Sequence, residues 1–173
     1  MIGAETLSRV VDNDDRDAMI FSDGAGACVL SASDDDSKGI LAHATQSFTK
    51  DESHYLYNDK SFSGSGAPDS RYIRMEGRKI YEFALNHVPN AMKTALEKSG
   101  VPLKNIKKVL LHQANEKMDQ AIIDRFYALY EQEAPEGIMP MSINTLGNSS
   151  VATVPTLLDL ILKQKLEGHQ IEI

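Results

Sequence analysis

The sequence has a single cysteine, no tryptophan and no long apolar run. Because Cys28 is alone, neither a disulfide within the chain nor a pair of cysteine metal ligands can form, which is typical of a reducing compartment. No stretch approaches the roughly 20 consecutive apolar residues that a membrane-spanning helix needs. Residues 1–12 lack the charged leader and apolar block of a secretory signal. We therefore expect a cytoplasmic protein with no membrane partner.

Positive charge is also scarce. The 18 lysine and arginine residues are outnumbered by 25 aspartate and glutamate residues, which gives a net charge of -7 at pH 7. Nucleic-acid binding needs clustered cations that neutralise phosphates, so we expect no nucleic-acid partner. His43, His54, His87 and His169 do not have the spacing of metal ligands, and we expect no metal site.

What is present is an alternation of helices and strands. With 173 residues, 42% of them hydrophobic and 25% charged, the chain suits one compact domain over residues 1–173. Apolar periodicity predicts helices at 5–12, 76–100, 116–131 and 150–168. It predicts strands at 18–33, 40–48, 106–111, 136–143 and 169–173. This order predicts an α/β fold with a mixed, five-stranded type of sheet, covered by helices and truncated in its last strands.

Local features refine this prediction. The first two strands are expected to pair as an antiparallel hairpin, and the polar residues 49–73 to form a long surface loop. Gly24 and Gly26 inside the first strand indicate a bulge or the close approach of another backbone. Pro89 is expected to kink the longest helix.

Two polar residues stand where a predicted strand gives way to a predicted helix. His112 opens the stretch HQAN, and Asn148 lies in LGNSS. Ligands of α/β proteins bind at the carboxyl ends of strands. An imidazole N–H and a carboxamide N–H that converge on one carbonyl oxygen stabilise negative charge developing there. The alternatives are structural: His112 is then a satisfied histidine at a strand end, and Asn148 belongs to a turn in which Ser149 or Ser150 caps the next helix.

The motifs, in their order, resemble those of a known family. The stretches GAETLSRVVD, FSDGAGACVL, HQAN and TLGNSSVATVP resemble the C-terminal half of β-ketoacyl-acyl-carrier-protein synthase III, the initiating condensing enzyme of bacterial fatty-acid synthesis, which has the thiolase fold. The resemblance implies an acyltransferase with a Cys-His-Asn triad in which His112 and Asn148 are catalytic. Both would stabilise the enolate that forms when malonyl-acyl-carrier protein loses carbon dioxide. The enolate then attacks an acyl group held on the cysteine.

The cysteine of that triad has no counterpart in this sequence. In the family the nucleophile belongs to the N-terminal half, at a strand-to-helix turn. Cys28 instead lies within a glycine-rich strand, where a cysteine is usually a small apolar filler. The family's late glycine-rich loop, which would follow HQIEI, is also missing. We therefore expect residues 1–173 to belong to a longer enzyme and to be inactive alone.

The resemblance also implies partners. Lys117 and Arg125 follow HQAN, where the family presents basic residues to the acidic acyl carrier protein, although an ordinary solvated helix face is the alternative. Acyl-CoA and malonyl-acyl-carrier protein would carry the substrates on phosphopantetheine, with no cofactor of the enzyme itself. The full-length enzyme is expected to be a homodimer.

Two other functions are compatible with the same residues. One is a non-catalytic partner subunit that binds carrier protein or completes a cysteine-bearing chain. The other is a related thiolase-fold condensing enzyme of secondary metabolism, because the pocket for the starter acyl group lies largely in the half that the sequence lacks. An upstream extension with a cysteine turn favours an enzyme, whereas a native stop at both ends favours the subunit.

Overall fold

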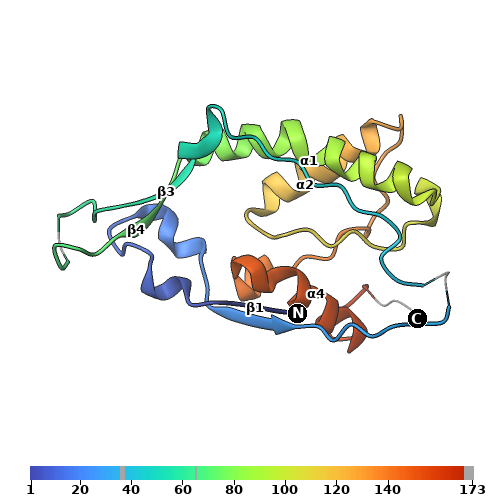
Figure 1. Cartoon of the computed structure of the whole chain (residues 1–173), viewed down its shortest axis with the longest axis horizontal. Helices are drawn as coiled ribbons and strands as arrows, with labels where there is room; N and C mark the ends of the chain where they lie inside the picture. The colour runs from blue at the N-terminus through green and yellow to red at the C-terminus, as the bar shows by residue number, and fades with distance from the viewer. Residues whose placement is uncertain (36–37, 65, 170–173) are drawn as a thin grey trace.

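A computed structural model describes residues 1–35, 38–64 and 66–169 of the chain and confirms the α/β class. Its strands are β1 (Ile2–Glu5), β2 (Gly24–Ala27), β3 (Leu56–Asp59) and β4 (Tyr72–Met75). Its α-helices are α1 (Gly77–Ser99), α2 (Glu116–Ala128), α3 (Ile143–Leu146) and α4 (Thr153–Leu162). Figure 1 shows α1 and α2 together along one side of the molecule and β1, β2 and α4 along the other. No helix in this described part of the chain is long and apolar enough to cross a bilayer.

The strands pair differently from the prediction. β1 pairs with β2 and β3 pairs with β4, both antiparallel, so the described residues form two two-stranded sheets in place of one five-stranded sheet. The expected partner of β2, residues 40–48, has no regular structure. Residues 2–5 take its place, and the helix expected over 5–12 shrinks to a 3₁₀ turn at Leu7–Arg9. The predicted loop at 49–73 contains β3 and the first half of β4, and the last predicted strand lies almost wholly outside the described residues.

Two further predicted strands, 106–111 and 136–143, run side by side without forming a ladder. One backbone hydrogen bond joins them in their middle, from the Val109 N–H to the Ile138 carbonyl at 2.9 Å. Pro140 has no N–H to donate, which disfavours a regular ladder. The buried side chain of Gln113 substitutes for it, donating to the Pro140 carbonyl at 2.9 Å and accepting from the Ser142 N–H at 2.8 Å. These two hydrogen bonds hold Gln113, the residue next to His112, in place.

The helices α1 and α2 pack on each other through large apolar side chains. α1 matches the predicted helix to within a residue at each end, and it stops at Gly100, whose φ of 68° is the left-handed conformation that glycine adopts readily. α2 begins at Asn115, whose Oδ1 accepts from the backbone N–H groups of Lys117 and Met118. The apolar cluster between the two helices includes the fully buried side chains of Ile123 and Phe126.

Pro89 lies inside α1 without ending it. A proline there leaves the carbonyl four residues earlier, that of Leu85, without its helical donor. The guanidinium of Arg125 on α2 fills the gap, because its Nη1 donates to the Leu85 carbonyl at 3.0 Å. The cation thereby ties the two helices together at the proline.

The glycines of β2 allow the close approach that the sequence indicated. A Cβ added to Gly26 would lie 2.5 Å from Pro155 Cγ, and one added to Gly24 would lie 2.8 Å from Ser149 Cβ. The β1–β2 sheet therefore rests directly on the segment 148–155. That segment begins with a 3₁₀ turn at Ser150–Ala152, so the helix expected over 150–168 starts at Thr153 and ends at Leu162.

Candidate active site

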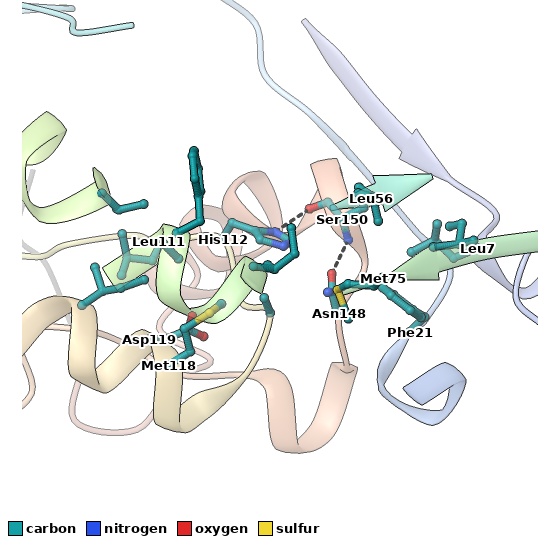
Figure 2. A pocket seen from close by; sticks show the side chains of 17 residues that line it. Leu7, Phe21, Leu56, Met75, Leu111, His112, Met118, Asp119, Asn148 and Ser150 are labelled. Atoms are coloured by element: carbon teal, nitrogen blue, oxygen red, sulfur yellow. Dashed lines mark hydrogen bonds between the residues drawn. The ribbon is translucent and has the colours of Figure 1, made fainter. Parts of the chain in front are cut away.

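A cavity of about 460 Å³ lies between the helix pair and the β1–β2 side of the molecule. Four of its 17 lining residues carry polar side chains: His112, Asp119, Asn148 and Ser150. The rest of the wall is apolar and comes from α1, α2, the segment before α2, the connection between β1 and β2, and the β3–β4 hairpin. The structure thus brings His112 and Asn148, from separate parts of the sequence, into one largely apolar cavity (Figure 2).

His112 sits between the anchored Gln113 and the end of the 106–111 segment. Its Nδ1 lies 3.2 Å from the Ser150 carbonyl oxygen. A carbonyl can only accept, so this hydrogen bond holds the proton on Nδ1 and leaves a lone pair on Nε2 of the neutral ring. The apolar surroundings lower the pKa of His112 below its ordinary value of 6.5, and the Ser150 carbonyl partly offsets this shift.

Asn148 is held by both its backbone and its side chain. Its N–H donates to the Ile20 carbonyl at 2.8 Å and its carbonyl accepts from Ser22 N–H at 2.9 Å, so residues just before β2 fix its place. Its Oδ1 accepts from the Ser150 N–H at 2.9 Å, which leaves the two Nδ2 hydrogens as donors at the wall of the cavity. The turn weighed from the sequence is therefore present, but neither Ser149 nor Ser150 caps the following helix with its side chain.

Ser150 connects the two predicted site residues. Its N–H reaches Asn148 and its carbonyl reaches His112, as the dashed lines of Figure 2 show. The residue has a φ of 53°, which is uncommon for a serine and costs energy that the surrounding contacts must supply. One strained residue thus orients both polar groups.

Asp119 is the cavity residue that the sequence reasoning missed. It is 1% exposed, and burial raises its carboxyl pKa to about 7. The available signal was its register, because Asp119 precedes the buried Ile123 and Tyr127 by one and two helical steps of four.

Lys117 and Arg125 do not share a surface hollow. Lys117 lines a shallow groove with Met139 and Met141, whereas Arg125 is bonded to α1 as described. Cys28 is absent from the cavity wall, and its backbone pairs with that of Met1. Within the described ranges, no group of three or more potential metal ligands occurs.

Comparison with known proteins gives a consistent result. A sequence model described as 3-oxoacyl-[acyl-carrier-protein] synthase III matches residues 1–48, and one described as the C-terminal part of the same enzyme matches residues 96–171. The chain is 32% identical to β-ketoacyl-[acyl-carrier-protein] synthase III 2 of Lactiplantibacillus plantarum, over 95% of this chain and 51% of that protein. It is 35% identical to the synthase III of Synechococcus, over 92% of this chain and 47% of that protein.

The fold agrees with these matches. The crystal structure of a synthase III from Thermus thermophilus superposes with a TM-score of 0.77 at 26% identity, covering 95% of this chain and 50% of that one. This confirms the expected thiolase-like fold class. The chain spans about half the length of the curated relatives it matches, 51% and 47% in the two cases above.

Proposed function

Because the chain belongs to the 3-oxoacyl-[acyl-carrier-protein] synthase III family, we propose that it supplies the His112 and Asn148 part of a condensing active site. The reaction is acyl transfer with decarboxylation. Malonyl-acyl-carrier protein loses carbon dioxide, the bonding electrons move to the thioester oxygen as an enolate, and the enolate carbon attacks an acyl group delivered from acyl-CoA to a cysteine. That cysteine lies outside residues 1–173 in this proposal, since Cys28 is not among the residues of the cavity wall.

The observation that supports the proposal is the shared anchoring of two polar groups in an apolar cavity. Preorganised donors in a low-dielectric site stabilise developing charge more strongly than water does. Asn148 offers Nδ2 hydrogens because its oxygen is occupied by Ser150. Ser150 occupies Nδ1 of His112 and Oδ1 of Asn148, so the other polar atom of each side chain remains for a ligand.

The hydrogen bond between His112 and Ser150 determines how the imidazole can act. With the proton held on Nδ1, Nε2 donates to the thioester oxygen only when the ring is an imidazolium. The malonyl carboxylate brings a negative charge into the cavity, and this charge favours the protonated ring. In the proposal, substrate binding and proton uptake by His112 therefore occur together.

The experiment separates two half-reactions in an enzyme that joins residues 1–173 to a cysteine-bearing N-terminal half. His112→Ala should lower carbon dioxide release from malonyl-acyl-carrier protein by roughly 100-fold to 1,000-fold, with acyl loading of the cysteine within a few-fold of the parent. His54→Ala, at an exposed position away from the cavity, serves as the control. Equal loss of both half-reactions would assign His112 a structural role.

The alternative of a non-catalytic subunit is tested by the same assay. A joined enzyme that loads acyl groups but never decarboxylates malonyl-acyl-carrier protein would favour the subunit. The isolated chain is expected to show no condensation, so turnover by purified residues 1–173 would contradict the proposal.

The proposal assigns contact with the acyl carrier protein to Lys117. In the described part of the chain its ammonium forms no ion pair, whereas the Arg125 guanidinium already bonds the Leu85 carbonyl. Lys117→Glu should raise the KM for malonyl-acyl-carrier protein more than Arg125→Gln does. Homodimerisation and a cytoplasmic location belong to the same proposal.

A further inference from the structure

The carboxyl group of Asp119 is a polar feature of the cavity that the proposed condensation does not use. The residue lies in the first turn of α2 and lines the cavity between the apolar side chains of Met118 and Ile122 (Figure 2). It is 1% exposed, and neither carboxyl oxygen has a hydrogen-bond partner among the residues that the structure describes. Buried polar atoms in proteins nearly always have partners, so an unpartnered carboxyl group in a cavity wall marks a position where a ligand can supply one.

In the described part of the chain, Asp119 forms no ion pair that would compensate its ionised form. The face of α1 that packs on α2 is apolar. On α2 itself Glu116 and Lys117 are exposed. His112 is the other titratable residue of the cavity wall and is neutral near pH 7, because its pKa is lowered. The backbone amides of Ala114 and Asn115 favour the carboxylate, but neither is in hydrogen-bonding geometry with it.

We propose that Asp119 is a ligand-binding residue that, as a neutral carboxylic acid, donates a hydrogen bond to an uncharged oxygen of a ligand with an apolar body. The ligand class follows from the wall. Apolar side chains accommodate alkyl groups, and a protonated carboxyl supplies one O–H donor. The carbonyl oxygen of an amide, ester or thioester can accept this hydrogen bond. An anionic ligand group at the same place would be repelled by Asp119 whenever the carboxyl group is ionised.

The inference concerns the same cavity as the proposed condensation but does not depend on turnover. Ionisation of Asp119 removes its donor and adds a buried negative charge. Binding of an uncharged ligand should therefore weaken as pH rises through the carboxyl pKa of about 7. Asn148 does not titrate and His112 titrates at lower pH, so this window belongs to Asp119.

The test uses the complete 173-residue chain and hexanamide, an amide that stays uncharged across the range. Its Kd, followed by NMR shifts of cavity methyl groups, should be about 10-fold weaker near pH 8 than near pH 6. Asp119→Asn keeps an N–H donor and cannot ionise, so its Kd should be the same at both pH values. Asp124→Asn, an exposed carboxylate on the same helix, should retain the parental pH dependence.

A third variant separates hydrogen bonding from simple charge exclusion. Asp119→Leu removes both charge and donor, so it should bind hexanamide about 5-fold more weakly near pH 6 than Asp119→Asn does. Equal affinity of these two variants would overturn the donor role. A parental Kd that does not change with pH, or a pH dependence that persists in Asp119→Asn, would overturn the assignment altogether.

Discussion

The helix pair and the β1–β2 side of the molecule are held together in different ways. The helices α1 and α2 are joined by large side chains such as Ile123 and Phe126, which are 0% and 1% exposed. The β1–β2 sheet instead meets the segment 148–155 through glycines, where an added Cβ would collide with the side chains of Pro155 and Ser149. His112 lies just before α2, in the first of these regions, and Asn148 begins the segment 148–155, in the second.

This difference shows what each region tolerates. A side-chain interface responds to volume, because removed atoms leave a cavity that only partly collapses. An interface formed at glycines responds to any added atom, because the segment that the glycines touch must move. The site spans both kinds of interface, so the two segments that carry its polar groups depend on separate structural requirements.

Removing the central aromatic ring should have the largest effect on stability. Phe126→Ala is expected to lower the free energy of unfolding by about 4 kcal/mol, measured by urea denaturation. Phe126→Leu keeps most of the volume and should cost less than about 1.5 kcal/mol. If both variants lost the same amount, the edge contacts of the ring with Tyr127 and Tyr130 would matter more than volume.

Adding one methyl group to the sheet should come next. Gly26→Ala places a Cβ 2.5 Å from the Pro155 ring, and the expected loss is about 3 kcal/mol. Ala25→Ser, at an exposed position of the same strand, should be nearly neutral. A neutral Gly26→Ala would break the comparison, because it would mean that the sheet can move away from residues 148–155 freely.

Replacing the titratable Asp119 in the cavity wall should have a smaller effect on the free energy of unfolding, and this change should stabilise the protein. The carboxyl pKa of Asp119 rises from 3.8 to about 7 on folding, so the folded chain keeps a proton that the unfolded chain releases. The contribution of Asp119 to stability is therefore greatest below pH 3.8 and falls as pH rises to about 7. Asp119→Asn should be more stable than the parent by about 2 kcal/mol near pH 8, after allowance for solvent reaching the cavity.

The same variant should show little difference from the parent near pH 4. Urea denaturation at the two pH values measures both. A constant difference between the proteins would show that the amide changes packing and that ionisation is not responsible.

The smallest effect concerns the tie between the two helices. Arg125→Met removes the donor to the Leu85 carbonyl and should cost about 1 kcal/mol. Pro89→Ala restores a helical N–H for that carbonyl, so the loss should largely vanish in the double variant. Lys117→Met, an exposed cation on the same helix, is the control. Strict additivity would mean that the guanidinium does not compensate for the proline.

The sequence predicted the parts of the structure that rest on long periodic patterns or on special residues. The helices α1 and α2 repeat their apolar spacing over several turns, and Gly24 and Gly26 marked a close approach that the structure contains. His112 and Asn148, each placed just before a helical segment, line the same cavity, although their convergence on one oxygen stays a prediction. Their catalytic roles stay predictions.

The rest depended on contacts that periodicity does not encode. All four residues of β3 are exposed, so the strand has no alternation of buried and exposed positions to detect. The identity of the partner of β2 is a tertiary choice between two short segments. The substitution of Gln113 for a strand ladder requires Pro140, 27 residues later. Likewise, the role of Arg125 is apparent only once Pro89 lies opposite.

Ser150 has a consequence for how the site can diverge among related proteins. Its two backbone atoms orient the imidazole and the carboxamide together, so rotating its peptide bonds would disturb both groups at once. Natural variation therefore cannot retune one donor and spare the other. Changes in ligand preference are expected to accumulate in the aliphatic and aromatic wall instead, with the paired donors inherited as a unit.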